Sequence, residues 1–232
     1  MIKRKIKELV LPRDTKILVH IGKCGGSTIR NAVARSEVGQ GMRITHITKP
    51  PVSRRFKYYI VARSPISRAV SAFNWRYRLV VIRGNQEARF PGQHEVLTRY
   101  KTMNDLALSL YVPDGTPNLR AHKDIRKIHH LKEDIAFYLA DLLKVIGSEQ
   151  VEAVMMQENL NADIERVFGY SNTEILKGNA AATDPQKRLL DEAALRNLRR
   201  FFAKDFECLT TLYCWNKIEK ETFLKIFDAP NG

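Results

Sequence analysis

Residues 16–35 read KILVHIGKCGGSTIRNAVAR. The run Lys16–Ile21 is short, apolar and rich in β-branched residues, which is typical of a buried strand. It ends at Gly22, and apolar residues then recur at i, i+3 and i+4 between Ser27 and Ala34, the spacing of one helix face. The stretch therefore predicts a strand, a glycine-rich turn and a helix, in that order.

The same alternation continues along the chain. Further apolar runs predict strands at Arg43–Thr48, Tyr58–Ala62 and Val151–Met156. Helical patterns predict helices over residues 64–73, with Ser64 as N-cap and Pro65 in the first turn, over 131–146, and over 185–213 with room for one break. Strands separated by helices pair in parallel. We expect an α/β fold: a P-loop-like, doubly wound parallel sheet of about four to five strands, flanked by helices in three layers.

Composition sets the class of protein. The 232 residues are 44% hydrophobic, enough for one domain with a real core, over residues 1–232 with a basic arm at 1–13. No signal peptide or transmembrane run is visible, and three cysteines do not make a disulfide framework. We expect a cytoplasmic location, or the Golgi lumen if the sequence is a trimmed piece. The net charge of +14 favours an anionic partner.

The turn after the first strand has the residues of an anion-binding loop. Paired glycines let successive backbone N–H groups converge, and a helix N-terminus adds its partial positive charge. Lys23 supplies a full charge, and the Ser27 and Thr28 hydroxyls can donate hydrogen bonds. A Walker A loop places its lysine after the glycines, whereas Lys23 precedes them, so an ATP- or GTP-hydrolysing P-loop is disfavoured. The alternative is an ordinary strand–helix turn.

The end of the Tyr58–Ala62 strand offers an arginine and a serine eight residues apart. Arg63 follows the strand directly, and Ser64, Arg68 and Ser71 share one polar helix face at i, i+4 and i+7. A guanidinium and a hydroxyl that converge from two elements suit a terminal phosphate. The alternative is a surface arginine followed by an N-cap serine.

Taken together, the two motifs resemble a known family. HIGKCGGST at 20–28, followed after the next strand by Arg63-x-Pro-x-x-Arg-x-x-Ser71-x-Phe73, resembles the sulfotransferases that use 3′-phosphoadenosine 5′-phosphosulfate. The likeness is greatest to the carbohydrate-type branch that includes heparan sulfate and uronosyl 2-O-sulfotransferases, although Cys24 and Ser64 stand where that family often has Thr and Asp. Weaker likenesses continue at Gln157–Leu160, Lys177–Asn179 and Phe202–Tyr213.

The resemblance implies a set of cofactor contacts. It assigns Arg63 and Ser71 to the 3′-phosphate. It assigns the first loop to the 5′-phosphosulfate, through Lys23, Cys24, Gly25, Gly26, Ser27 and Thr28.

The implied reaction is in-line transfer of a sulfuryl group to a hydroxyl acceptor, a carbohydrate or anionic glycan, without a metal and without nucleic acid. Lys23 would neutralise charge on the leaving phosphate. A hydroxyl acceptor also needs a general base. In the similar enzymes a histidine upstream of the Arg-x-Pro strand is the base, which points to His46. The open alternatives for the base are His129, His130, His94 and Glu95, and His20 is interpreted as structural.

Two other function classes remain as alternatives. One is a kinase-like P-loop phosphotransferase acting on a nucleotide or small molecule. The other is a basic nucleic-acid-binding module, which would need aromatics interleaved on a basic face. We expect the Arg76–Arg99 stretch to be irregular, and we expect His129 and His130 to open a helix. The basic residues of Arg76–Arg99 and Arg120–Lys132 either contact the acceptor or form plain surface.

Overall fold

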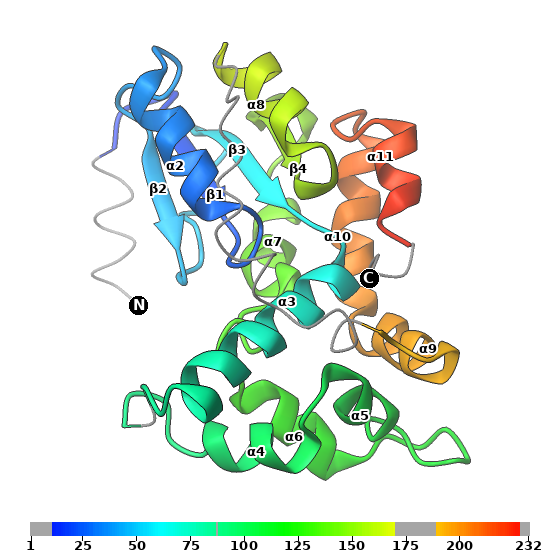
Figure 1. Ribbon diagram of the computed structural model, residues 1–232. Coiled ribbons are helices and arrows are strands. Elements are labelled where there is room, and N and C mark those ends of the chain that lie inside the picture. The colour runs from blue at the N-terminus through cyan, green and yellow to red at the C-terminus, as the bar shows by residue number, and fades with distance from the viewer. Residues whose placement is uncertain (1–10, 87, 170–188, 228–232) are drawn as a thin grey trace.

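The computed structural model describes residues 11–86, 88–169 and 189–227 (Figure 1). Its sheet has four parallel strands in the order β2-β1-β3-β4. These strands are β1 (Lys16–His20), β2 (Arg43–His46), β3 (Lys57–Ala62) and β4 (Val151–Met156). The four predicted strands are all present, and the α/β class with a parallel sheet is confirmed.

The two central strands, β1 and β3, are covered on both faces. Ile17, Leu18 and Val19 on β1 are fully buried, as is Ile60 on β3, which is why these segments are continuous apolar runs. The chain leaves β1 toward β2 in one direction and leaves β3 toward β4 in the other. In an open parallel sheet, such a reversal creates a crevice beyond the carboxyl ends of the two central strands.

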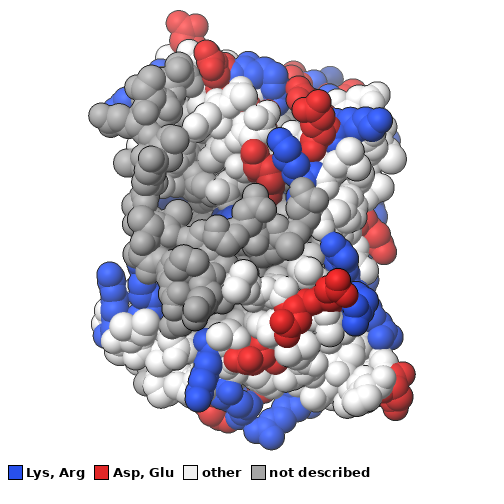
Figure 2. Space-filling view, turned by 45° about the vertical axis from the view of Figure 1, so that its right-hand side comes forward, with Lys and Arg blue, Asp and Glu red and all other residues white. Residues whose placement is uncertain are grey.

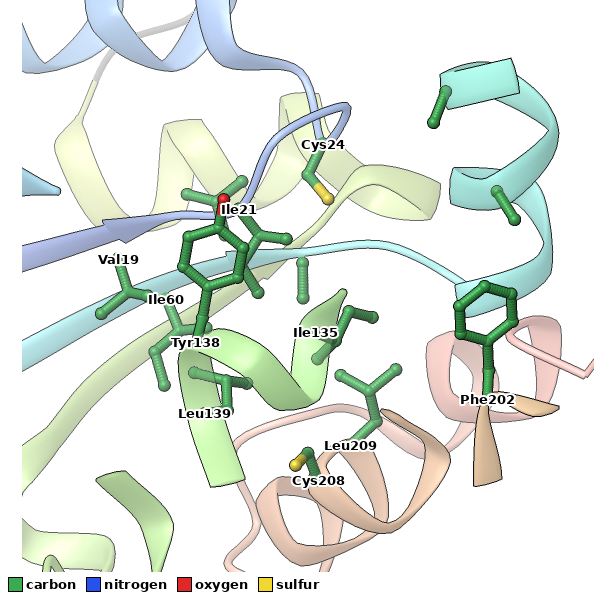
Figure 3. Packing of buried hydrophobic residues seen from close by; sticks show 14 of the residues in the cluster. Val19, Ile21, Cys24, Ile60, Ile135, Tyr138, Leu139, Phe202, Cys208 and Leu209 are labelled. Atoms are coloured by element: carbon green, nitrogen blue, oxygen red, sulfur yellow. The ribbon is translucent and has the colours of Figure 1, made fainter. Parts of the chain in front are cut away.

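The described helices lie partly against the two faces of the sheet and partly away from it (Figures 1 and 3). They are α2 (Gly26–Arg35), α3 (Pro65–Tyr77), α4 (Gln93–Tyr100), α5 (Met103–Leu108), α6 (Leu119–Lys127), α7 (Ile135–Leu143), α8 (Leu160–Phe168), α9 (Glu192–Phe201), α10 (Ala203–Cys214) and α11 (Lys220–Lys225). Helix α2 packs against α8, and α7 packs against α10. Figure 1 shows α3 running from the sheet to a separate group formed by α4, α5 and α6.

The core between the strands and α7 is closely packed. Figure 3 shows α2 above the strands and α7 and α10 below them. The Tyr138 ring of α7 stands beside Val19 and Ile60, Leu139 lies lower in the view, and all four side chains are buried (Figure 3). Burial of each large apolar side chain stabilises the fold by about 1.5–3 kcal/mol, so this interface fixes α7 beneath the sheet.

The first turn of α3 follows the sequence prediction in part. Pro65 lies in the first turn as predicted, but the Ser64 side chain does not cap the helix. Its hydroxyl donates to the carbonyl oxygen of Ile226 at 2.7 Å. Ser64 therefore ties the start of α3 to the C-terminal part of the described chain.

The segment from Arg76 to Arg99 is not irregular throughout, and that prediction is wrong. Helix α3 runs on to Tyr77, a π-helical turn (η1, Arg78–Ile82) continues it, and α4 begins at Gln93. The apolar residues Val96 and Leu97 of α4 are fully buried. Burial of this short apolar face stabilises α4, although the charged residues around it hide the helical pattern in the sequence.

The predicted helix over 131–146 begins later, at Ile135. Asp134 is its N-cap, with a carboxylate oxygen 2.7 Å from the Phe137 backbone nitrogen. Asp205 on α10 accepts hydrogen bonds from the backbone N–H groups of Ile135 and Ala136. His129 and His130 therefore lie in the turn between α6 and α7 and do not open a helix.

The predicted helical region 185–213 is divided at Phe202 into α9 and α10, and residues 185–188 lie outside the described residues. The Lys177–Asn179 motif and most of the basic N-terminal arm lie outside them too. In the part of the chain that the structure describes, no helix is both long and apolar enough to cross a bilayer.

Candidate anion-binding site

The glycine-rich turn between β1 and α2 is tightly enclosed. Lys23 (φ +72°) and Gly25 (φ +86°) both have left-handed backbone conformations. A side chain at Gly22 would collide with the His130 ring, and one at Gly26 would collide with the His20 ring. The glycines are therefore needed both for the turn and for the close approach of two imidazoles.

The N-terminus of α2 is open to an anion. Within the described chain, helix α2 has no side-chain cap, and its first turn contains no acidic residue. The first backbone N–H groups of a helix have no partner within it, and the helix dipole adds partial positive charge there. Ser27 is exposed and Thr28 is partly exposed in this first turn. The geometry favours binding of a phosphate or sulfate group at this position.

Lys23 belongs to a group of cations at the loop. Its Nζ lies 4.6 Å from the centre of the Trp75 ring, and the guanidinium carbon of Arg78 lies 4.8 Å from the same ring. Burial lowers the pKa of Lys23 to about 8, with further lowering by Arg63, Arg78 and Arg68. These positively charged side chains repel one another, and an anion bound among them would reduce that repulsion.

Arg63 lies at the end of β3, beside the loop. Its Nη1 donates to the Lys23 carbonyl oxygen at 3.5 Å. The neighbouring Ser64 backbone N–H donates to Glu158 Oε1 at 2.8 Å, and burial raises the pKa of Glu158. The structure thus brings Lys23 and Arg63 together, as the sequence predicted.

Ser71 is half-buried on α3, about two turns beyond Arg63. The hydrogen bonds between described residues do not include one from Ser71 to the loop.

Arg68 has a structural role that the helical pattern did not indicate. It is 1% exposed, and its Nε donates to the Gly22 carbonyl oxygen at 2.9 Å. Its Nη2 donates to the carbonyl oxygens of His130, at 2.7 Å, and Glu133. The guanidinium therefore joins the loop to the turn before α7, so Arg68 is buried against backbone carbonyl groups although the sequence places it on a polar helix face.

The Cys24 side chain points into the core, away from the open end of the loop (Figure 3). Its Sγ lies 3.8 Å from the Gly22 carbonyl oxygen, and burial raises the pKa of the thiol to about 12. The thiol is therefore neutral, so any contribution of Cys24 to anion binding comes from its backbone N–H.

Four histidines form a cluster beside the loop. The rings of His20 and His46 stack with centres 4.4 Å apart and an angle of 16° between their planes. The His46 ring lies 6.3 Å from that of His130, which lies 4.1 Å from that of His129. Three of the five base candidates, His46, His129 and His130, are thus brought together.

The other two candidates, His94 and Glu95, lie on α4. Glu95 is exposed and pairs with Arg99 on the same helix. A carboxylate held in an exposed ion pair is a poor base compared with an imidazole beside the loop.

Burial keeps the deeper imidazoles neutral. It lowers the pKa of His20 to about 4 and that of His130 to about 2. The pKa of His46 is lowered by burial, raised by its hydrogen bond to the His20 carbonyl and lowered by Arg30. Because its pKa is lowered, His46 is neutral at neutral pH, and it is less buried than His20 and His130.

Among the described residues, no group of three or more His, Cys, Asp or Glu side chains could hold a metal ion. Trp75 and Glu158 are also neighbours of the loop, and neither was predicted as a site residue. Trp75 follows Ser71 by four residues, so the shared helix face could have indicated it. Glu158 lies in the Gln157–Leu160 stretch that follows the Val151–Met156 strand, so the sequence did indicate its segment, but only the pairing of β4 with β3 places the carboxyl group near the loop.

Comparisons of this chain with protein-family models, curated proteins and solved structures gave no significant match.

Proposed function

We propose that this chain is a sulfotransferase that moves a sulfuryl group from 3′-phosphoadenosine 5′-phosphosulfate to a hydroxyl acceptor. The observation that carries the proposal is the convergence, at the carboxyl ends of adjacent parallel strands, of the Lys23–Arg63 cation pair, an uncapped helix N-terminus and the neutral His46. In this interpretation the sheet is a P-loop-like, doubly wound one in three layers, with its ligand at the switch point between β1 and β3.

The loop and α3 offer groups for both ends of such a donor. The backbone N–H groups from Cys24 to Thr28 and the Lys23 ammonium would bind the 5′-phosphosulfate. Arg63 and Ser71 would bind the 3′-phosphate. Burial is the main cause of the lowered pKa of Lys23, and the nearby arginines lower it further, so the crowded cations favour a ligand with several negative charges.

The chain's own residues then have distinct tasks. When bound, the donor supplies an activated sulfuryl group, which the acceptor oxygen takes as the bond to the 5′-phosphate breaks. His46 accepts the proton of the acceptor hydroxyl, since its imidazole is neutral at neutral pH. Lys23, largely protonated below its pKa of about 8, neutralises charge on the leaving phosphate oxygen. The loop holds these groups in place, which is most of the catalysis in a reaction of this type.

The competing function classes make different demands. A kinase-like phosphotransferase needs a lysine placed for the β- and γ-phosphates and a metal site, and Lys23 precedes the glycines. A nucleic-acid-binding module needs a basic surface with stacking aromatics. On the described part of the face in Figure 2, Lys and Arg side chains are interspersed with Asp and Glu. Both classes are outcomes of the experiment below.

The test is ligand-dependent stabilisation of the purified protein. At a concentration about 100 times its dissociation constant, adenosine 3′,5′-bisphosphate should stabilise the wild type by about 2.7 kcal/mol. Lys23→Ala and Arg63→Ala should each weaken binding about tenfold or more. Lys123→Ala is the matched control, because Lys123 is exposed on α6, and it should bind like the wild type. Stabilisation by ATP or by an oligonucleotide, with none by the bisphosphate, would overturn the proposal.

A further inference from the structure

The imidazoles of His20 and His46 lie side by side because of the strand register. Parallel pairing of β1 with β2 places His20 directly opposite His46. Their rings stack 4.4 Å apart, and His46 Nδ1 lies 3.3 Å from the His20 carbonyl oxygen. One residue therefore contacts His46 twice, through its backbone and through its ring.

We infer that His20 is the positioning residue for His46, fixing both the tautomer and the plane of the imidazole that faces the acceptor. This inference rests on the proposed function, in which His46 is the base. A carbonyl oxygen only accepts hydrogen bonds, so its contact with Nδ1 selects the tautomer that carries the proton there. The Nε2 lone pair is then the one available to take a proton.

The His20 ring is buried and closely packed. It is 4% exposed, and it packs against Gly26, where any side chain would collide with it. Its Nδ1 is buried and has no hydrogen-bond partner among the described residues. A buried polar atom without a partner costs about 1–3 kcal/mol, which an apolar side chain at this position would avoid. The imidazole at position 20 therefore has an energetic cost, and stacking on His46 is a role that would account for it.

Because other basic groups already surround His46, a neutral ring at position 20 is favoured over a charged one. Arg30 of α2 lies near enough to lower its pKa, and His130 and His129 face it from the turn before α7. A second cation at position 20 would oppose the proton that His46 must accept. Burial of His20, which keeps its ring neutral down to about pH 4, removes that opposition.

The test is nuclear magnetic resonance of the His46 imidazole nitrogens in the ligand-free protein, followed as a function of pH. In the wild type, we expect the proton of neutral His46 on Nδ1 and a pKa below 6.5. In His20→Ala, water reaches the exposed ring face. The pKa should then rise toward its ordinary value, while the proton should stay on Nδ1, because the carbonyl oxygen of residue 20 is unchanged. His20→Phe keeps a flat ring and should restore the wild-type titration.

His122→Ala is the matched control, because it removes an imidazole packed between Tyr111 and Phe201 instead of one beside the loop. It should leave the His46 signals unchanged. A wild-type His46 with its proton on Nε2, or a His20→Ala protein in which His46 titrates as in the wild type, would overturn the inference. If His20→Ala does not fold, the wild-type tautomer alone decides. The readout needs neither donor nor acceptor, so failure of adenosine 3′,5′-bisphosphate to bind counts against the proposed function separately.

Discussion

Acid should destabilise this protein through its buried histidines. The pKa values of His20 and His130 in the folded chain, about 4 and about 2, lie below the ordinary value of 6.5. The unfolded chain therefore binds more protons than the folded chain once the pH falls below about 6.5. The stabilisation from neutral burial is fully present above that pH, and it is lost progressively as the pH falls toward the folded pKa values.

The size of the effect follows from these shifts. At about pH 5.5, one unit below the unfolded pKa, each histidine contributes a loss of about 1.4 kcal/mol. Both residues are less than a tenth exposed, so solvent screening reduces this figure little. The wild type should lose about 3 kcal/mol from the two histidines between about pH 7.5 and about pH 5.5. His20→Phe, which cannot titrate, should lose only about half of that.

The assay is urea unfolding of both proteins at the two pH values. Asp205 acts in the opposite direction, because burial and nearby Asp134 raise its pKa to about 7, and its contribution is lost as the pH rises through that value. The two proteins share Asp205, so the difference between their pH dependences isolates His20. Equal losses in wild type and His20→Phe would refute the assignment of His20 as a buried neutral imidazole.

Three further predictions concern single residues. Arg68→Lys should destabilise the fold by about 3 kcal/mol in urea unfolding, because an ammonium cannot reach all three carbonyl oxygens that the guanidinium binds. Asp205→Ala should cost about 2–4 kcal/mol in the same assay, because the N–H groups of Ile135 and Ala136 lose their acceptors. Affinity for adenosine 3′,5′-bisphosphate, measured by titration calorimetry, should fall as the pH rises through about 8, where Lys23 loses its charge, and the fall should be absent in Lys23→Ala.

The sheet was predictable from the sequence because its strands carry their own pattern. Ile17, Leu18 and Val19 are buried, so the centre of β1 is a continuous apolar run, and a glycine follows soon after the strand. The position of the loop at the carboxyl end of β1 then follows from the parallel pairing. The meeting of Lys23 with Arg63 was predictable for the same reason, since β1 and β3 are neighbours.

The remaining features depend on contacts between distant parts of the chain. Arg68 shares a polar helix face with Ser71, and a helical pattern cannot show that the loop and the turn before α7 cover that face. The histidine cluster joins β1 and β2 to the turn at 129–130, which lies about 80 to 110 residues further along the sequence. The start of α7 at Ile135 depends on a carboxylate from α10, which no local propensity reveals.

The central claim, that the loop and Arg63 bind the two ends of a 3′-phosphorylated adenine nucleotide, is tested most directly by titration calorimetry with three ligands. Adenosine 3′,5′-bisphosphate should bind one to one, and adenosine 5′-monophosphate, which lacks the 3′-phosphate, should bind about tenfold or more weakly. In Arg63→Ala this preference should largely disappear. Equal affinity of the wild type for the two nucleotides, or tighter binding of ATP than of the bisphosphate, would contradict the account.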